Sequence, residues 1–179
     1  MAEPMGLTTR NAQLAETRPG QGNDRFITFS LGKEVFAMDT RFIKEVIQYP
    51  DLTEVPLAPA AIRGVINLRG SVVPVVDLGQ RFGWGGTDIA RRTCVVIVET
   101  GQEGDLATLG VLVDQVAEVL EIAPSDVVPA PSFGSRLRED FILGVGKVRG
   151  RFIILLNVPR VLCIEELASH ALSCSEAMP

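Results

Sequence analysis

One hairpin motif occurs twice in this chain, and the repetition limits what the chain can fold into. Residues 64–78 read GVINLRGSVVPVVDL, two runs rich in β-branched residues on either side of Arg69-Gly70. Residues 144–157 read GVGKVRGRFIILLN, with Arg149-Gly150 at the same place. Such runs around a glycine predict a β-hairpin whose turn uses the backbone freedom of glycine. The sequence therefore predicts the same hairpin at two places.

The segments upstream of each hairpin also match. Three segments of the first half correspond to three of the second in the same order: 35–39 with 110–114, 45–47 with 118–120, and 55–56 with 128–129. We therefore expect one small β unit that is duplicated, with a first lobe at about residues 24–86 and a second lobe at about 87–157. The glycine-rich stretch 83–88 is expected to be a flexible boundary between the lobes.

The first lobe begins with two further strands. Residues 26–31 and 35–38 are rich in aromatic and β-branched residues, which predicts strands joined by a tight turn. Asp39 or Thr40 can cap a short helical turn over residues 41–45, because a side-chain oxygen accepts the free amide hydrogens of a first turn. Many short strands at this spacing indicate a mainly β fold of barrels or a sandwich.

The two ends of the chain have a different composition. Residues 1–23 are rich in small polar residues and lack the apolar core of a signal peptide, so we expect a disordered tail on a cytoplasmic protein. Apolar residues recur with helical spacing after Pro159, which predicts an amphipathic C-terminal helix over about residues 158–172. Residues 173–179 are expected to be flexible, and the ordered domain is expected to span residues 24–168.

Charge and hydropathy exclude two classes of partner. Seventeen basic residues against twenty-two acidic ones give a net charge of −5, which opposes binding to nucleic acid or to anionic lipid. The apolar residues come in strand-length runs, never in the eighteen or more that cross a bilayer. We expect no nucleic-acid partner and no insertion into a membrane.

The residue types that catalysis and metal binding require are scarce. Cys94, Cys163 and Cys174 are odd in number and widely spaced, which argues against a disulfide framework and against a zinc site. The single histidine, His170, lies in the predicted C-terminal helix, far from the duplicated hairpins. The carboxylates that lie at strand ends are expected to cap turns or form salt bridges, namely Asp39, Glu45, Asp77, Asp114 and Glu118. The sequence predicts no catalytic residue, no metal and no cofactor.

Glu45 and Arg69 form the polar pair that stands out. Each lies beside an apolar run, and the planar guanidinium of an arginine can hold a carboxylate through two parallel hydrogen bonds. Such a salt bridge would fix the hairpin turn against the strand that follows the short helical turn. The pair could be a structural brace, a contact for a partner, or both.

With these motifs the chain resembles the CheW-type coupling proteins of bacterial chemosensory systems. The resemblance covers roughly residues 24–165 and rests on the segments 26–32, 36–39, 62–70, 73–78, 109–114 and 128–131. Its most specific part is the sequence NLRG followed by VPVVDL. Two mild departures are Asn157, where the family usually carries an aspartate, and Cys94, where it carries an aliphatic residue.

The resemblance implies a fold, a function and a set of partner-binding positions. The implied fold is a pair of five-stranded SH3-like β-barrels with a C-terminal helix and no catalytic activity. Such adaptors are scaffolds that join the cytoplasmic tips of methyl-accepting chemoreceptors to the histidine kinase CheA, whose regulatory domain shares this fold, in arrays at the inner face of the membrane. By motif, the partner-facing positions are Ile43, Glu45, Val46, Gly64, Arg69, Gly70, Gly110, Val116 and Val119, and most of the glycines among them could instead be purely structural.

Two other functions remain open at the level of sequence. An adaptor of a non-flagellar chemosensory pathway, controlling pili, surface behaviour or a second messenger, would use the same residue types on its partner surfaces. A double barrel that binds a small molecule would require an enclosed polar pocket between the lobes, with converging ionisable groups.

Overall fold

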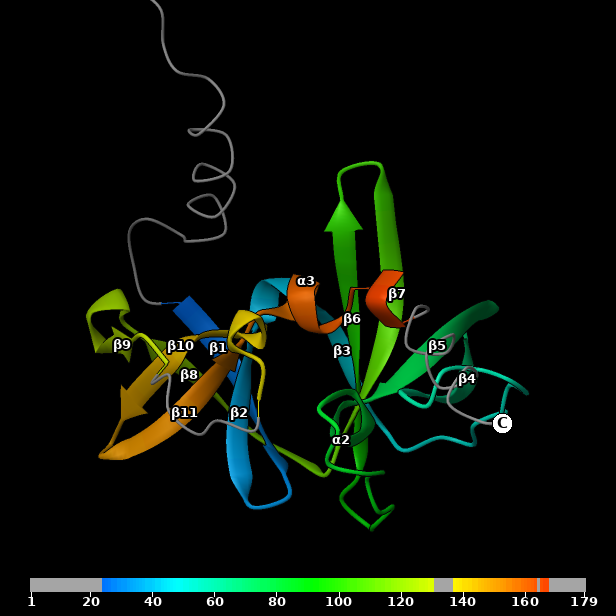
Figure 1. Ribbon diagram of the computed structural model, residues 1–179, viewed down its shortest axis with the longest axis horizontal. Coiled ribbons are helices and arrows are strands. Elements are labelled where there is room, and N and C mark those ends of the chain that lie inside the picture. The colour runs from blue at the N-terminus through cyan, green and yellow to red at the C-terminus, as the bar shows by residue number, and fades with distance from the viewer. Residues whose placement is uncertain (1–23, 131–136, 164, 168–179) are drawn as a thin grey trace, which may run out of the picture.

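The structure is a computed structural model that describes residues 24–130, 137–163 and 165–167 (Figure 1). Most of the regular structure in these ranges is β-strand, so the predicted mainly β fold is confirmed. The helices in the same ranges are all too short or too polar to span a membrane.

The strands form two sheets that lie beside each other (Figure 1). We call the six-stranded sheet, with the order β8-β1-β2-β11-β10-β9, sheet A, and the five-stranded sheet, with the order β3-β6-β7-β5-β4, sheet B. Sheet A consists of β1 (Asp24–Leu31), β2 (Glu34–Asp39), β8 (Gln115–Ile122), β9 (Val127–Val128), β10 (Ile142–Val148) and β11 (Arg151–Leu156). Sheet B consists of β3 (Ile43–Gln48), β4 (Ile62–Leu68), β5 (Ser71–Asp77), β6 (Cys94–Gln102) and β7 (Asp105–Val113). Among the described strands each sheet keeps two edges, so the expected barrels are not closed.

The two sequence repeats exchange their first hairpins. The hairpin β1–β2 of the first repeat pairs with β8 and β11 of the second repeat, and the hairpin β6–β7 of the second pairs with β3 and β5 of the first. Both exchanged hairpins join their new sheet through a parallel pair, β2 with β11 and β7 with β5. Each sheet therefore combines both halves of the chain, and the lobes expected at about 24–86 and 87–157 do not correspond to the two sheets.

The crossing from sheet A to sheet B is made by η1 (Thr40–Phe42), a single 3-10 turn. Asp39 caps it as predicted, because its Oδ1 accepts a hydrogen bond of 2.9 Å from the amide of Arg41. The turn is shorter than the expected 41–45, so Glu45 belongs to β3. An apolar pattern specifies which face of a strand is buried and not which strand pairs with it, which is why the repeat carries no signal for the exchange.

The duplicated hairpin itself is confirmed. Arg69 and Gly70 have φ values of 51° and 88°, and Arg149 and Gly150 have 51° and 77°. A positive φ at both central residues is typical of the two-residue turns whose twist matches that of the flanking strands. In the first copy, Asn67 Oδ1 also accepts a hydrogen bond of 2.9 Å from the amide of Gly70.

Three apolar clusters hold the two sheets. One packs within sheet A and one within sheet B, and the largest, which we call the central cluster, receives side chains from both sheets. A single strand serves two clusters, since Val73 and Val75 of β5 face the sheet B cluster and Val76 faces the central one. The fully buried aromatic residues of the central cluster are Phe29, Phe36 and Phe141.

Asp77 fixes the loop that follows sheet B. Its carboxylate is completely buried, where it accepts hydrogen bonds of 2.9 Å from the amide of Gly79, at the start of α2 (Leu78–Arg81), and of 2.8 and 2.7 Å from the amide and the hydroxyl of Thr87. Arg63 pairs with it at 2.9 Å. Thr87 is buried as a result, so the stretch 83–88 is anchored near its end and is not the flexible boundary that its glycines suggested.

The chain after β11 does not form the single helix expected over 158–172. The helix α3 (Val158–Val161) ends after one turn, residues 162–163 are not helical, and residues 165–167 are helical again. The buried Arg81 donates a hydrogen bond of 2.8 Å from Nε to the carbonyl of Val161, which occupies an acceptor that a continuing helix would use. Residues 168–179 and the expected tail 1–23 lie outside the described residues.

Arg81 belongs to an ion-pair network that ties α2 to the C-terminal segment. Glu166 accepts hydrogen bonds from Arg81 at 2.7 Å, from Arg138 at 3.1 Å and from Arg160 at 3.1 Å. Asp140 accepts hydrogen bonds of 2.7 Å from Arg138 and from Arg160. The network therefore crosses from the end of the first repeat to the end of the second.

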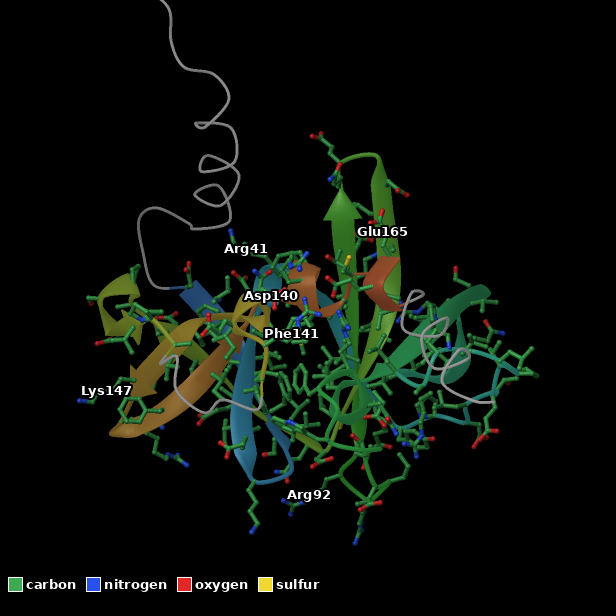
Figure 2. The ribbon with its side chains drawn as sticks, viewed as in Figure 1. Arg41, Arg92, Asp140, Phe141, Lys147 and Glu165 are labelled. Atoms are coloured by element: carbon green, nitrogen blue, oxygen red, sulfur yellow. The ribbon has the colours of Figure 1, made fainter. Side chains whose placement is uncertain are left out.

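Phe141 lies next to Asp140 at the junction of the two sheets (Figure 2), and two arginines of the network pack on its ring. The guanidinium carbon of Arg81 lies 4.7 Å and that of Arg138 lies 4.4 Å from the centre of its ring. Each of these distances is within the range of a favourable cation–π contact. The ring thus joins the charged network to the central cluster.

Stability should depend on pH through this network. Hydrogen bonds from Arg138 and Arg160 lower the pKa of Asp140 to about 2, and those from Arg81 and Arg138 lower the pKa of Glu166 below its usual value. A carboxylate whose pKa is depressed in the folded state stabilises the fold at neutral pH, and this stabilisation is lost as pH falls through that pKa.

We expect Asp140→Asn to reduce the free energy of unfolding at pH 7 by about 0.5–1 kcal/mol, a small loss because the ion pairs of Asp140 are partly exposed. Urea denaturation at pH 7, 4 and 2.5 measures the free energy of unfolding of the variant and of the unmodified protein. If both proteins lose the same free energy of unfolding between pH 4 and 2.5, the expected contribution of Asp140 is contradicted.

The hairpin exchange predicts how a divided chain behaves. Fragments 1–88 and 89–179, made separately, each lack strands that both sheets need, so neither should show cooperative thermal unfolding. Mixed in equal amounts, they should form a one-to-one complex with the circular dichroism spectrum of the intact chain. Size-exclusion chromatography and thermal melts check both statements. A fragment that folds cooperatively as a monomer would show that the repeats do not depend on each other.

Candidate partner-binding surface

The structure contains the ion pair expected between Glu45 and Arg69. Arg69 Nη2 lies 2.9 Å from Glu45 Oε2, a single hydrogen bond and not the expected two. The Arg69 side chain is 78% exposed and that of Glu45 27%, so the contact lies at the surface of sheet B. An exposed pair of this kind stabilises a fold by at most about 1 kcal/mol. Its main effect is to orient the arginine at the tip of the hairpin.

An open groove lies beside this ion pair. Strands β3, β5 and β7 and the β4–β5 turn contribute its walls, and it combines charged, hydroxyl and apolar groups. The lining residues are Lys44, Glu45, Leu68, Arg69, Ser71, Val72, Val73 and Thr108. Val72 is 72% exposed there, although its neighbour Val73 is buried. The groove therefore offers a partner an apolar contact next to a fixed charge pair.

Strand β3 divides its residues between the core and this surface. Ile43 is half-buried against the central cluster, whereas Val46 is 38% exposed. The strand is an edge of sheet B, with β6 on its other side. A β-bulge between Ile43 and Glu45 changes the register along β6. The free edge of β3 and the exposed Val46 lie open to a partner.

Val116 and Val119 occupy the corresponding edge of the other sheet. They lie on β8, which is an edge of sheet A and has a similar bulge opposite Ile27 and Phe29. Val116 packs against the central cluster, and Val119 is 55% exposed. The structure thus places the predicted surface residues on the edges of two different sheets and does not gather them into one patch on a single sheet.

Gly64 and Gly110 do not belong to an exposed surface. Both are buried, and a β-carbon at Gly64 would lie 2.6 Å from the carbonyl oxygen of Thr53. A β-carbon at Gly110 would lie 2.8 Å from a methyl group of Val95. Close packing of backbone explains these glycines, in contrast to Gly70, which is exposed in the turn. Their burial favours the structural role for Gly64 and Gly110 over direct contact with a partner.

Sequence reasoning missed six of the eight residues that line the groove, namely Lys44, Leu68, Ser71, Val72, Val73 and Thr108. Val72 had no distinguishing signal, because it lies in an unbroken apolar run in which the outward position resembles the inward ones. Lys44 lies directly before Glu45 and forms an ion pair with Glu99 of β6. The only sequence signal was the alternation of residues along β3, which puts Lys44 on the exposed side of the strand with Val46 and Gln48.

The gap that lies between the two sheets, in the part of the chain that the structure describes, is apolar. The small gap there is lined by apolar side chains alone and has no room for a water molecule. The lining residues are Met38, Leu78, Val111, Leu156, Val158, Val161 and Leu162. A small-molecule site would require an enclosed space with converging polar groups, so this observation counts against that alternative.

The carboxylates singled out in the sequence have structural partners. Asp39 and Asp77 cap η1 and α2, and Asp114 accepts a hydrogen bond of 2.7 Å from the amide of Gly32. Within the described ranges no three His, Cys, Asp or Glu side chains are grouped as a metal site would require. Cys94 and Cys163 are free thiols, while His170 and Cys174 lie outside the described residues.

Comparisons of this chain with family models, with curated proteins and with solved structures all find similarity to CheW-like proteins. The family model for the CheW-like domain matches residues 25–166. The chemotaxis protein CheW of Klebsiella aerogenes is 33% identical, over 91% of this chain and 93% of its own length. The protein FrzA of Myxococcus xanthus is 32% identical, over 84% of this chain and 91% of its own length. A solved structure, the scaffolding protein TtCheW from Thermoanaerobacter tengcongensis, superposes with a TM-score of 0.68 at 30% identity, covering 79% of this chain and 88% of that one.

The assignment of Gly64 to the interior can be tested by stability. Gly64→Ala should lower the free energy of unfolding by about 1–3 kcal/mol, because the added methyl group meets a backbone carbonyl that has little room to move. Gly146→Ala is a matched control, since its methyl group would meet side-chain methyl groups and no backbone atom, the nearest being Ile122 Cδ1 at 3.2 Å, and should cost less. Urea denaturation compares the two variants. Equal stability of Gly64→Ala and the unmodified protein would reopen a surface role for Gly64.

Proposed function

The chain belongs to the CheW-like family, and from this premise we propose that it is a scaffold that couples methyl-accepting chemoreceptors to the histidine kinase CheA. The protein acts by binding and carries out no reaction of its own. It works in the cytoplasm, at receptor arrays on the inner face of the membrane. A change in the receptor then alters the activity of the kinase through contacts with this chain.

The observation that carries the proposal is the open groove beside the Glu45–Arg69 pair. A receptor tip is helical, and a helix binds in a groove through apolar side chains on one of its faces. Val72 supplies exposed apolar area in the groove, and Arg69, held by Glu45, supplies a positioned charge. The groove therefore supports recognition of a helix by both shape and charge.

The sheet edges support the second half of the proposal. A β-strand at the edge of a sheet presents unpaired amide and carbonyl groups, which another β domain can meet. The edges β3 and β8 carry the exposed Val46 and Val119 at equivalent positions of the two repeats. A kinase regulatory domain of the same fold would offer similar edges. A coupling scaffold must bind two partners at separate places, and the β8 edge lies on a different sheet from the groove.

Reversal of the charge at Arg69 tests the proposal. In Arg69→Glu the new carboxylate faces Glu45, so we expect receptor binding to weaken by about tenfold or more, while the far-ultraviolet circular dichroism spectrum and the urea midpoint stay close to those of the unmodified protein. The assay combines purified receptor fragment, CheA and this protein, and measures receptor-dependent autophosphorylation together with direct binding.

Arg149→Glu is the matched control for this variant. Arg149 lies in the same turn conformation at the other hairpin, so the substitution changes the same charge in an equivalent backbone.

Autophosphorylation that never becomes receptor-dependent when the unmodified protein is added would refute the proposed function. Normal binding by Arg69→Glu would remove the groove from the receptor interface.

A further inference from the structure

The turn at residues 55–58 holds a leucine in an unfavourable state. Leu57 has a φ of 62° and a fully exposed side chain, at 101% of the reference exposure. The amide of Ala58 donates a hydrogen bond of 3.3 Å to the carbonyl of Val55, which closes a four-residue turn with Pro56 at its second position. A positive φ at the third position of such a turn favours glycine or asparagine. A leucine there is disfavoured both by its backbone and by its contact with water.

No requirement of the fold explains this leucine. The other two non-glycine residues with positive φ among the described residues, Arg69 and Arg149, lie in hairpin turns that need this conformation. The equivalent segment of the second repeat has Ala130 at the position of Leu57, and Ala130 does not have a positive φ. The strain is therefore particular to the first repeat. Strained residues that packing does not explain are concentrated at functional sites.

The turn projects from a firm base. Thr53 and Val65 exchange two backbone hydrogen bonds of 2.9 Å, which attach the loop to the edge of β4. Leu52 packs against the apolar cluster of sheet B. Beyond this base, Val55 and Pro56 are exposed together with Leu57. The result is a small apolar projection whose position is fixed before any partner binds.

The charged residues that adjoin the projection in the chain are negative. Asp51 and Glu54 are both exposed and form no ion pair with other described residues. A complementary surface would be an apolar pocket bordered by lysine or arginine side chains. A projecting side chain needs a concave partner. The tip of a helical receptor is convex and suits the groove beside Arg69, whereas a globular domain can provide a pocket.

We propose that Leu57 is an apolar anchor that inserts into a basic-rimmed pocket on the regulatory domain of the kinase. This inference rests on the proposed function and adds a residue, Leu57, that contributes to kinase binding and not to receptor binding. Anchor residues of this kind, buried in a partner's pocket, dominate the affinity of many interfaces. The cost of keeping a leucine at this position in the free protein is then offset in the complex.

Leu57→Asn tests the inference because it moves stability and binding in opposite directions. Asparagine tolerates a positive φ, so the urea midpoint of the variant should equal or exceed that of the unmodified protein. The dissociation constant for the purified CheA regulatory domain should rise by about tenfold or more. Binding to a receptor signalling fragment should stay within about twofold. Isothermal titration calorimetry with the full-length chain measures both affinities.

Two control variants define the result. Leu57→Met keeps an apolar side chain of similar size and should retain kinase binding within about threefold. Leu106→Asn removes another exposed leucine, on the β6–β7 hairpin, and should change neither affinity. If Leu57→Asn binds the kinase domain as tightly as the unmodified protein, or loses receptor binding to the same extent, the inference is wrong while the proposed function stands. If the unmodified protein binds neither partner, the proposed function fails first.

Discussion

The central cluster between the two sheets is the interaction on which the rest of the structure depends. Because the repeats exchange hairpins, the two sheets are joined by chain crossings and by this shared apolar core, in which Phe29 and Phe36 of sheet A meet Val111 of sheet B. Burial of apolar surface is not directional, so the cluster alone would leave the angle between the sheets weakly defined. The ion-pair network around Glu166 adds the directional contacts that packing lacks.

This arrangement explains how a chain of 179 residues could present the separate binding places that the proposed scaffold requires. The interior is occupied by apolar contacts and by carboxylates that already hold amide groups, as Asp77 does. The features open to partners lie on the outside: a groove beside Arg69, two strand edges, and the turn at Leu57. Under the proposed function, a rigid body of this kind would transmit the position of one partner to another through its shape.

The sequence predicted the local elements well and the long-range pairing poorly. The duplicated hairpin, the cap at Asp39 and the contact between Glu45 and Arg69 follow from residue types within short segments. The exchange of hairpins could not be predicted, because the strands of both repeats have similar apolar patterns and would satisfy either pairing. The glycines at 83–86 suggested a hinge, since the side chain that anchors the loop, Asp77, belongs to a preceding strand. Buried Gly64 and exposed Gly70 are indistinguishable by residue type, and only their backbone environment separates them.

The exchanged hairpins also set an order for folding during synthesis. Every strand of sheet B has been made once the ribosome has passed Val113, so this sheet can assemble while the remainder of the chain is still being translated. Strands β1 and β2 are made first but find their neighbours only when β8 and β11 emerge, the latter ending at Leu156. In the interval sheet B can already cover Phe29 and Phe36, but both edges of the nascent hairpin remain without a neighbouring strand. The earliest segment to leave the ribosome is therefore among the last to complete its sheet, and its unpaired edges are where a chaperone would have most to shield.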